Sequence, residues 1–210
     1  MTSIPDTRPA PFLPRLGQHL GALAALAWPV MLSRAGILAM ALADVIMLGR
    51  YSTQALGEAS VSLALFIPIM VTGVGLQMGV LSLVARRHGA GRAGETVDVW
   101  LRALPWAALA GGIGMGLMAL GELWLWLIGQ SPALVQGGGA FSRWVAPGVL
   151  FQVLYIACAF YLEGTGRPKP ALMAMILANL LNIGLNWVLI YGNLGMPELG
   201  AVGSAAGTTL

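Results

Sequence analysis

Five apolar runs in this 210-residue chain are each long enough to cross a lipid bilayer. A membrane-spanning helix needs about 20 mostly apolar residues. On that criterion we expect helices at about 22–48, 59–85, 100–121, 144–162 and 169–191. A sixth run starts at about residue 199 and reaches the last residue, Leu210. Because that run is too short to cross the bilayer, we expect the sixth helix to be incomplete and the chain to be a fragment of a longer protein.

The composition excludes a water-exposed globular domain. Charged residues make up 9% of the chain, whereas soluble domains carry about 25%. The net charge of +3 comes from lysines and arginines dispersed between apolar runs, so we expect no nucleic-acid partner.

The one cysteine, Cys158, lies inside an apolar run. It has neither a disulfide partner in the chain nor zinc-ligand spacing, and we expect no cofactor.

The positions of the basic residues predict the orientation. Residues 1–20 are polar and proline-rich, without the apolar core of a signal peptide. We expect a cytoplasmic N-terminal tail at 1–20 and a transmembrane lobe at 21–210. Basic residues concentrate before the first span and in the second and fourth connections, namely Arg8, Arg15, Arg86, Arg87, Arg92, Arg102, Arg167 and Lys169. Since cytoplasmic loops carry the excess of basic residues, we expect a multi-pass protein of the bacterial inner membrane with a cytoplasmic N-terminus.

Two ionisable residues lie within the first span, Arg34 and Asp44. Such a residue costs at least about 2.5 kcal/mol at the centre of a bilayer on insertion scales. The two lie about 15 Å apart along the helix and on different faces, so they do not pair within it. For Arg34 we favour a side chain that reaches the inner headgroups over a functional role. Asp44 is either an outer-interface residue or a carboxylate in an internal cavity that binds a proton, Na⁺ or a cationic substrate.

The fifth span carries a stripe of amides. Asn179, Asn182 and Asn186 are spaced three and four apart, which places them on one face of a helix. Unpaired amides are costly in lipid, so the stripe faces the protein. It either joins helices by hydrogen bonds or lines a site. At 1.5 Å per residue, Asp44, Asn182 and Asn186 lie at one depth, and Thr208 of the sixth run lies at about the same level.

A carboxylate, two amides and a hydroxyl at one depth form a plausible site for a proton or a hard cation. No metal site is certain, although Na⁺ at Asp44, Asn182 and Asn186 is possible. Motifs of soluble enzymes for phosphate, zinc or an activated serine are missing from the sequence, so we do not expect an enzyme. We interpret Gly137-Gly138-Gly139 as a flexible linker in an outer loop.

Several ordered motifs resemble the multidrug and toxic compound extrusion (MATE) family, in its bacterial NorM-like branch. Pro29 precedes Asp44 at the separation typical of the family, and Asp44 is followed by a stretch that contains Met and Gly. The other matching segments are Leu83-Val-Ala85-Arg-Arg-His-Gly89, Glu163-Gly164-Thr-Gly166-Arg167-Pro168 and, most specifically, Asn179-Leu-Leu-Asn182-Ile-Gly-Leu-Asn186-Trp187. The family often has Gln at the position of Arg86, and some members have Asp at the position of Asn186.

The resemblance implies an all-α fold, with this chain as the first six-helix lobe of a twelve-helix transporter whose C-terminal lobe is missing here. It also implies the export of cationic and amphipathic drugs in exchange for H⁺ or Na⁺, by a protein whose other partner is the membrane lipid. By motif, Asp44, Asn182, Asn186 and Thr208 would bind the ion and substrate, and Pro29 would bend the first helix. Asn179 and Arg34 are secondary candidates.

Two alternatives to a drug exporter remain at this stage. A flippase for lipid-linked precursors would share the helix pattern, but it needs cationic residues to hold a pyrophosphate, and Arg34 is the only candidate. An intramembrane enzyme needs a second catalytic group at the depth of Asp44, and the asparagines do not supply one.

Overall fold

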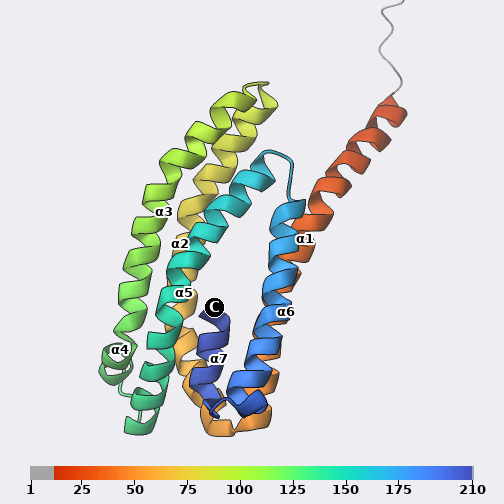
Figure 1. The fold of residues 1–210 in the computed structure, drawn as a ribbon. Helices are drawn as coiled ribbons and strands as arrows, with labels where there is room; N and C mark the ends of the chain where they lie inside the picture. Colours follow the sequence, from red (N-terminus) through yellow and green to blue (C-terminus); the bar gives the residue numbers. More distant parts are fainter. Residues whose placement is uncertain (1–11, 210) are drawn as a thin grey trace, which may run out of the picture.

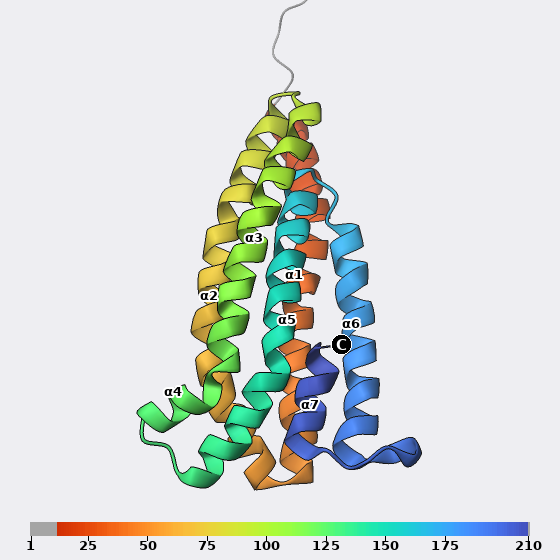
Figure 2. The same ribbon diagram turned by 60° about the vertical axis from the view of Figure 1, so that its left-hand side comes forward.

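The computed structural model describes residues 12–209, which form a bundle of α-helices (Figures 1 and 2). In chain order the elements are α1 (Phe12–Tyr51), α2 (Thr53–Gly89), the short 3₁₀ helix η1 (Ala93–Glu95), α3 (Thr96–Ala119), α4 (Gly121–Leu127), α5 (Pro132–Gly164), α6 (Lys169–Tyr191), the 3₁₀ helix η2 (Asn193–Gly195) and α7 (Gly200–Thr209). The described residues contain no β-strand. The predicted all-α fold is confirmed.

Five segments are long and apolar enough to cross a membrane, in α1, α2, α3 with η1, α5 and α6. The chain is therefore a multi-pass membrane protein. Several helices are longer than a bilayer requires. The 40 residues of α1 span about 60 Å at 1.5 Å per residue, against a hydrocarbon core of about 30 Å. The α7 helix has 10 residues, which corresponds to about 15 Å.

The N-terminal region differs from the expected tail at 1–20. Helix α1 already begins at Phe12, so residues 12–20 belong to the first helix. Residues 1–11 and Leu210 lie outside the described residues. The helix extends beyond the apolar run because a backbone that forms its own hydrogen bonds continues through polar sequence.

The interpretation of Gly137-Gly138-Gly139 as a loop linker is wrong. All three glycines lie within α5, which begins at Pro132, and the additional helix α4 precedes it. A Cβ atom at Gly138 would lie 2.8 Å from Val61 of α2, and one at Gly139 would lie 2.7 Å from Glu122 of α4. The Ser62 hydroxyl also donates a hydrogen bond of 2.6 Å to the Gly138 carbonyl. The glycines therefore allow close helix packing.

Helix α5 is at the centre of the lobe. It packs against α2, α3 and α4 on one side and against α7 on the other, whereas α1 lies along α6 (Figure 1). The short α7 lies between these two groups of helices at the end of the bundle where α1 meets α2. The lobe thus consists of a group formed by α2, α3 and α5 and a pair formed by α1 and α6.

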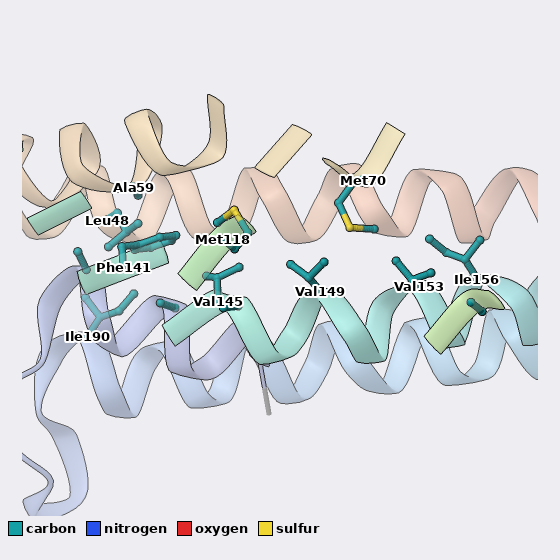
Figure 3. Packing of buried hydrophobic residues seen from close by; sticks show 14 of the residues in the cluster. Leu48, Ala59, Met70, Met118, Phe141, Val145, Val149, Val153, Ile156 and Ile190 are labelled. Carbon is teal, nitrogen blue, oxygen red and sulfur yellow. The ribbon is translucent and has the colours of Figure 1, made fainter. Parts of the chain in front are cut away.

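The apolar core follows one face of α5 (Figure 3). Its α5 members recur every three or four residues, as one helix face requires: Phe141, Val145, Val149, Val153 and Ile156. Side chains from five other helices pack against this face, among them Leu48 of α1, Met70 of α2, Met118 of α3, Ile190 of α6 and Ala205 of α7. Since Leu48, Phe141 and Ile190 lie at the α7 end, this is where the core joins the two groups.

Two glycines allow α7 to approach α6. A Cβ atom at Gly203 would collide with the Leu189 carbonyl, and one at Gly207 would lie 2.7 Å from Oδ1 of Asn186. Small residues four apart permit this close contact between membrane helices. The approach brings the side chain that follows Gly207, Thr208, to the level of the asparagines on α6.

We predict that Gly203→Ala lowers the thermal unfolding midpoint of the purified protein, because the added methyl group forces the α6 backbone and α7 apart. Overpacking of this kind costs about 1–3 kcal/mol. Gly184→Ala is the matched control, since Gly184 lies on α6 with open space around its Cβ position. Equal midpoints for the two variants would contradict the close approach.

Candidate functional site

The carboxylate of Asp44 on α1 contacts the amide of Asn186 on α6. Nδ2 of Asn186 donates a hydrogen bond to Oδ1 of Asp44 at 2.5 Å, between residues 142 positions apart in the chain. Asn186 is fully buried, while Asp44 is partly buried. The contact is possible because α1 and α6 lie side by side and both residues fall at one depth, as the sequence predicted.

Four side chains from three helices form a closed ring of hydrogen-bonding groups, called here the polar ring. Nδ2 of Asn186 also donates to Oδ1 of Asn182 at 3.2 Å. Nδ2 of Asn182 donates to Oγ1 of Thr208 at 3.2 Å. Oγ1 of Thr208 lies 3.4 Å from Oδ2 of Asp44 and completes the ring. The four residues that the sequence placed at one depth are therefore in mutual contact.

One oxygen at the polar ring has no partner among the described residues. Oδ1 of Asn186 is buried and accepts no hydrogen bond there. It lies against Gly207, where a Cβ atom would come within 2.7 Å of it. Buried polar atoms normally have partners. With the Asp44 carboxylate, this carbonyl adds a second hard oxygen to the arrangement.

The polar ring offers carboxylate, amide and hydroxyl oxygens, the ligand types that hard cations prefer. It contains one carboxylate. Within residues 12–209, no cluster of three or more His, Cys, Asp or Glu side chains could hold a metal ion. A single negative charge among neutral oxygens suits one proton or one monovalent cation better than a divalent ion, whose charge would stay uncompensated.

Asn179 and Pro29 lie outside the polar ring. Nδ2 of Asn179 donates to the carbonyl of Met175 in its own helix at 2.9 Å, beside Gly36 of α1. Pro29 is buried within α1, which continues through it, and the Ser33 hydroxyl donates to its carbonyl at 3.0 Å. Of the three amides in the stripe, Asn182 and Asn186 therefore belong to the polar ring, whereas Asn179 donates its hydrogen bond to a carbonyl of its own helix.

Arg34 of α1 forms an ion pair with Glu163 of α5. Its Nη2 lies 3.1 Å from Oε1 and 3.2 Å from Oε2 of Glu163. Its guanidinium also lies over the ring of Phe160, 5.3 Å from the centroid. The Glu163 side chain is 9% exposed and that of Arg34 is 44% exposed. The charge of Arg34 therefore has partners within the protein.

Sequence reasoning missed Glu163 because the fourth span was expected to end at 162, before it. In the structure α5 continues to Gly164, so Glu163 lies one turn after Phe160 on the same face. The spacing of Phe160 and Glu163 in the sequence could have indicated that Glu163 continues the helix. The pair joins α1 to α5, and the Tyr155 hydroxyl joins α5 to α6 by donating to the Ala171 carbonyl at 3.0 Å.

Fold and polar ring together define a multi-pass membrane protein with a hydrogen-bonded polar site inside its helix bundle. The MatE family model matches residues 29–188. The chain therefore belongs to the MatE family, and the predicted resemblance is confirmed.

Relatives of this chain are named as multidrug resistance proteins. The chain is 38% identical to a probable multidrug resistance protein NorM of Caulobacter vibrioides over 190 residues, which cover 87% of this chain and 39% of the relative. It is 33% identical to the multidrug resistance protein PmpM of Pseudomonas aeruginosa, covering 90% of this chain and 40% of the relative. The chain thus spans about 40% of the length of these relatives.

Solved structures have the same fold. An outward-facing multidrug resistance MATE family transporter of the MOP superfamily superposes with a TM-score of 0.80 at 25% identity, over 90% of this chain and 41% of that one. A MATE protein in complex with MaD5 superposes with a TM-score of 0.81 at 25% identity, over 90% of this chain and 42% of that chain.

We predict that Arg34→Gln and Glu163→Gln each lower the unfolding free energy by about 1–3 kcal/mol, because each leaves its partner without a charged hydrogen-bonding group. The double variant should lose less than the sum of the two, since neither charge is then left alone. A double-mutant cycle of thermal or denaturant unfolding in detergent measures the coupling. Strict additivity would show that the pair contributes nothing.

Proposed function

We propose that this chain forms one lobe of an ion-coupled multidrug exporter. The observation that carries the proposal is the polar ring, in which one carboxylate ties α1 to α6 and α7 inside a membrane bundle. An ionisable residue in a spanning helix indicates an ion or substrate pathway. Membership of the MatE family and the multidrug resistance names of the relatives support the same function.

The coupling step that we propose is the neutralisation of Asp44. As an anion, Asp44 accepts hydrogen bonds from Asn186 and Thr208. A proton or Na⁺ on the carboxylate competes with these donors. The Thr208 hydroxyl already lies 2.9 Å from the Ser204 carbonyl in its own helix, so it has an alternative acceptor. Ion binding would therefore weaken the ties that hold α1 against α6 and α7.

Helix α1 would respond by bending at Pro29. Proline removes one backbone hydrogen bond and weakens the helix at that point. Pro29 lies one turn before Arg34, whose pairing with Glu163 ties α1 to α5. If Arg34 keeps its pairing with Glu163 when Asp44 is released, the part of α1 from Pro29 to Asp44 would pivot about that contact, and Pro29 would take up the change in helix direction. Moving one charge across a potential of 100 mV is worth about 2.3 kcal/mol, comparable to a few hydrogen bonds.

Substrates and partners follow from the family. We propose that cationic and amphipathic drugs are exported from the cytoplasm or the inner leaflet, that H⁺ or Na⁺ supplies the energy, and that a second lobe completes the transporter. The flippase alternative loses its one cationic candidate, because Arg34 is paired with Glu163. The drug-resistance names of the relatives do not favour it either.

We predict that Asp44→Asn abolishes ethidium efflux from energised cells that express the protein as its gene encodes it. The amide carries no charge that an ion could neutralise, so efflux should fall to the level of cells without the protein. Asp98→Asn is the matched control, because Asp98 lies exposed in the first turn of α3, away from the polar ring.

The same assay identifies the ion. Efflux that an uncoupler stops but Na⁺ removal does not indicates H⁺, and the reverse indicates Na⁺. Wild-type efflux by a well-expressed Asp44→Asn variant would remove Asp44 from the coupling step. Absence of efflux from well-expressed wild type would reject ethidium export itself.

We also propose that the N-terminus and the connection between α2 and α3 face the cytoplasm, on the basis of the basic residues there. In a Cys158→Ser background, we predict that His88→Cys is not labelled by an impermeant maleimide in intact cells, whereas Ser131→Cys is labelled. Both native side chains are exposed, and they belong to opposite ends of the bundle. The reversed labelling pattern would invert the topology.

A further inference from the structure

A large groove lies between α2 and α3, on the side of the lobe away from α1 and α6. It has a volume of about 1020 Å³, and α2 and α3 supply nearly all of its lining, with Val153 of α5 behind them. This volume is at the upper end of those typical of ligand sites. Residues of the polar ring do not line it. The groove is thus separate from the proposed coupling site.

Most of the groove wall is apolar and accessible. Leu76 of α2 is 65% exposed, and Trp106 and Ile113 of α3 are 71% and 57% exposed. From Arg102 to Leu117 the groove follows α3 for about 22 Å at 1.5 Å per residue. Half of a 30 Å hydrocarbon core is about 15 Å. The apolar part is therefore long enough to hold the acyl chains of one leaflet.

One end of the groove is positively charged, where Arg87 of α2 and Arg102 of α3 both line it. Glu95 partly compensates Arg87, because its carboxylate Oε2 lies 4.0 Å from Nε of Arg87. The backbone carbonyl of Glu95 also accepts a hydrogen bond from Nη1 of Arg87 at 3.2 Å. Within residues 12–209, Arg102 makes no ion pair or side-chain hydrogen bond. Trp106 lies one turn further along α3, as expected of an aromatic side chain near the membrane interface.

We propose that this groove binds one anionic phospholipid. Its phosphate would lie at Arg102 and Arg87, and its acyl chains would follow the apolar wall towards Ile113. Guanidinium groups bind phosphate strongly, and basic pockets between spanning helices recognise anionic headgroups. The same two charges disfavour an organic cation at this position. The occupant is thus a membrane component and not a transported drug.

The headgroup part of the proposal is tested with the protein as its gene encodes it, purified in detergent and titrated with phosphatidylglycerol or phosphatidylcholine under native mass spectrometry. We expect one tightly bound phosphatidylglycerol and weaker phosphatidylcholine. Arg102→Gln should reduce the phosphatidylglycerol affinity by about fivefold, the effect expected of one basic residue at an anionic lipid. Arg50→Gln, at the last turn of α1 and outside the groove, is the control and should bind as wild type.

The acyl-chain part is tested by filling the groove. Gly79 lines it and has open space at its Cβ position; Gly75, one turn earlier on α2, has equally open space but does not line the groove. Gly79→Leu should reduce the binding of phosphatidylglycerol severalfold, whereas Gly75→Leu should not. A thermal melt of each variant without added lipid confirms that both fold.

Three outcomes would overturn the proposal. The first is equal binding of phosphatidylglycerol and phosphatidylcholine. The second is unchanged phosphatidylglycerol binding in both Arg102→Gln and Gly79→Leu. The third is full displacement by inorganic phosphate at the lipid's concentration, which would indicate a phosphate site without a role for the apolar groove. If Gly79→Leu does not fold, the comparison of Arg102→Gln with Arg50→Gln decides the proposal.

Discussion

A carboxylate inside a spanning helix must find its partners within the protein, and the hydrogen bond between Asp44 and Asn186 is where α1 meets this requirement. Much of the lobe follows from it. Helix α1 has to lie along α6, and α7 has to approach α6 closely enough for Thr208 to reach the same carboxylate. Gly203 and Gly207 provide that approach. Close packing of small residues thus serves the placement of one charged side chain.

The two ends of the lobe are held together by different forces. Near α7, the apolar core joins α1, α2, α3, α5 and α6 around Phe141 and Val145. Towards the opposite end, an ion pair between Arg34 and Glu163 joins α1 to α5, helped by the ring of Phe160. Packed apolar groups resist displacement because voids are costly, whereas a partly exposed ion pair is weaker and more easily broken. The polar ring lies near the better-packed end, where the residues around the proposed ion site are the most rigidly held.

Much of the fold was predictable from the sequence. Apolar runs located the five spans, and helix spacing with a rise of 1.5 Å per residue placed Asp44, Asn182, Asn186 and Thr208 at one depth. The depth of a residue in the membrane does not predict which helices are neighbours, because every spanning helix crosses the same layers. Resemblance to MATE proteins supplied that step, and the hydrogen bonds of the polar ring agree with it.

The incorrect predictions, those of the ends of α5 and of the glycine loop, have a common physical origin. Hydropathy detects where lipid surrounds a helix, but a helix continues wherever its backbone hydrogen bonds do. The expected boundaries therefore stopped short at both ends of α5, which hid Glu163 and turned Gly137-Gly138-Gly139 into a loop. Considered without their neighbours, three consecutive glycines suggested a flexible loop. In the structure they lie in α5, where their lack of a side chain allows α2 and α4 to pack closely.

The order of the polar ring along the chain has a consequence for biosynthesis. Asp44 belongs to α1, whereas Asn186 and Thr208 follow 142 and 164 residues later. At synthesis rates of about 5–20 residues per second, α1 waits roughly 7–30 s before its first partner exists. During that interval its carboxylate must stay hydrated, be protonated, or rest against the insertion machinery. Helix α1 can pack against α2 early, but it acquires its contacts with α6 and α7 only after the intervening helices have been made.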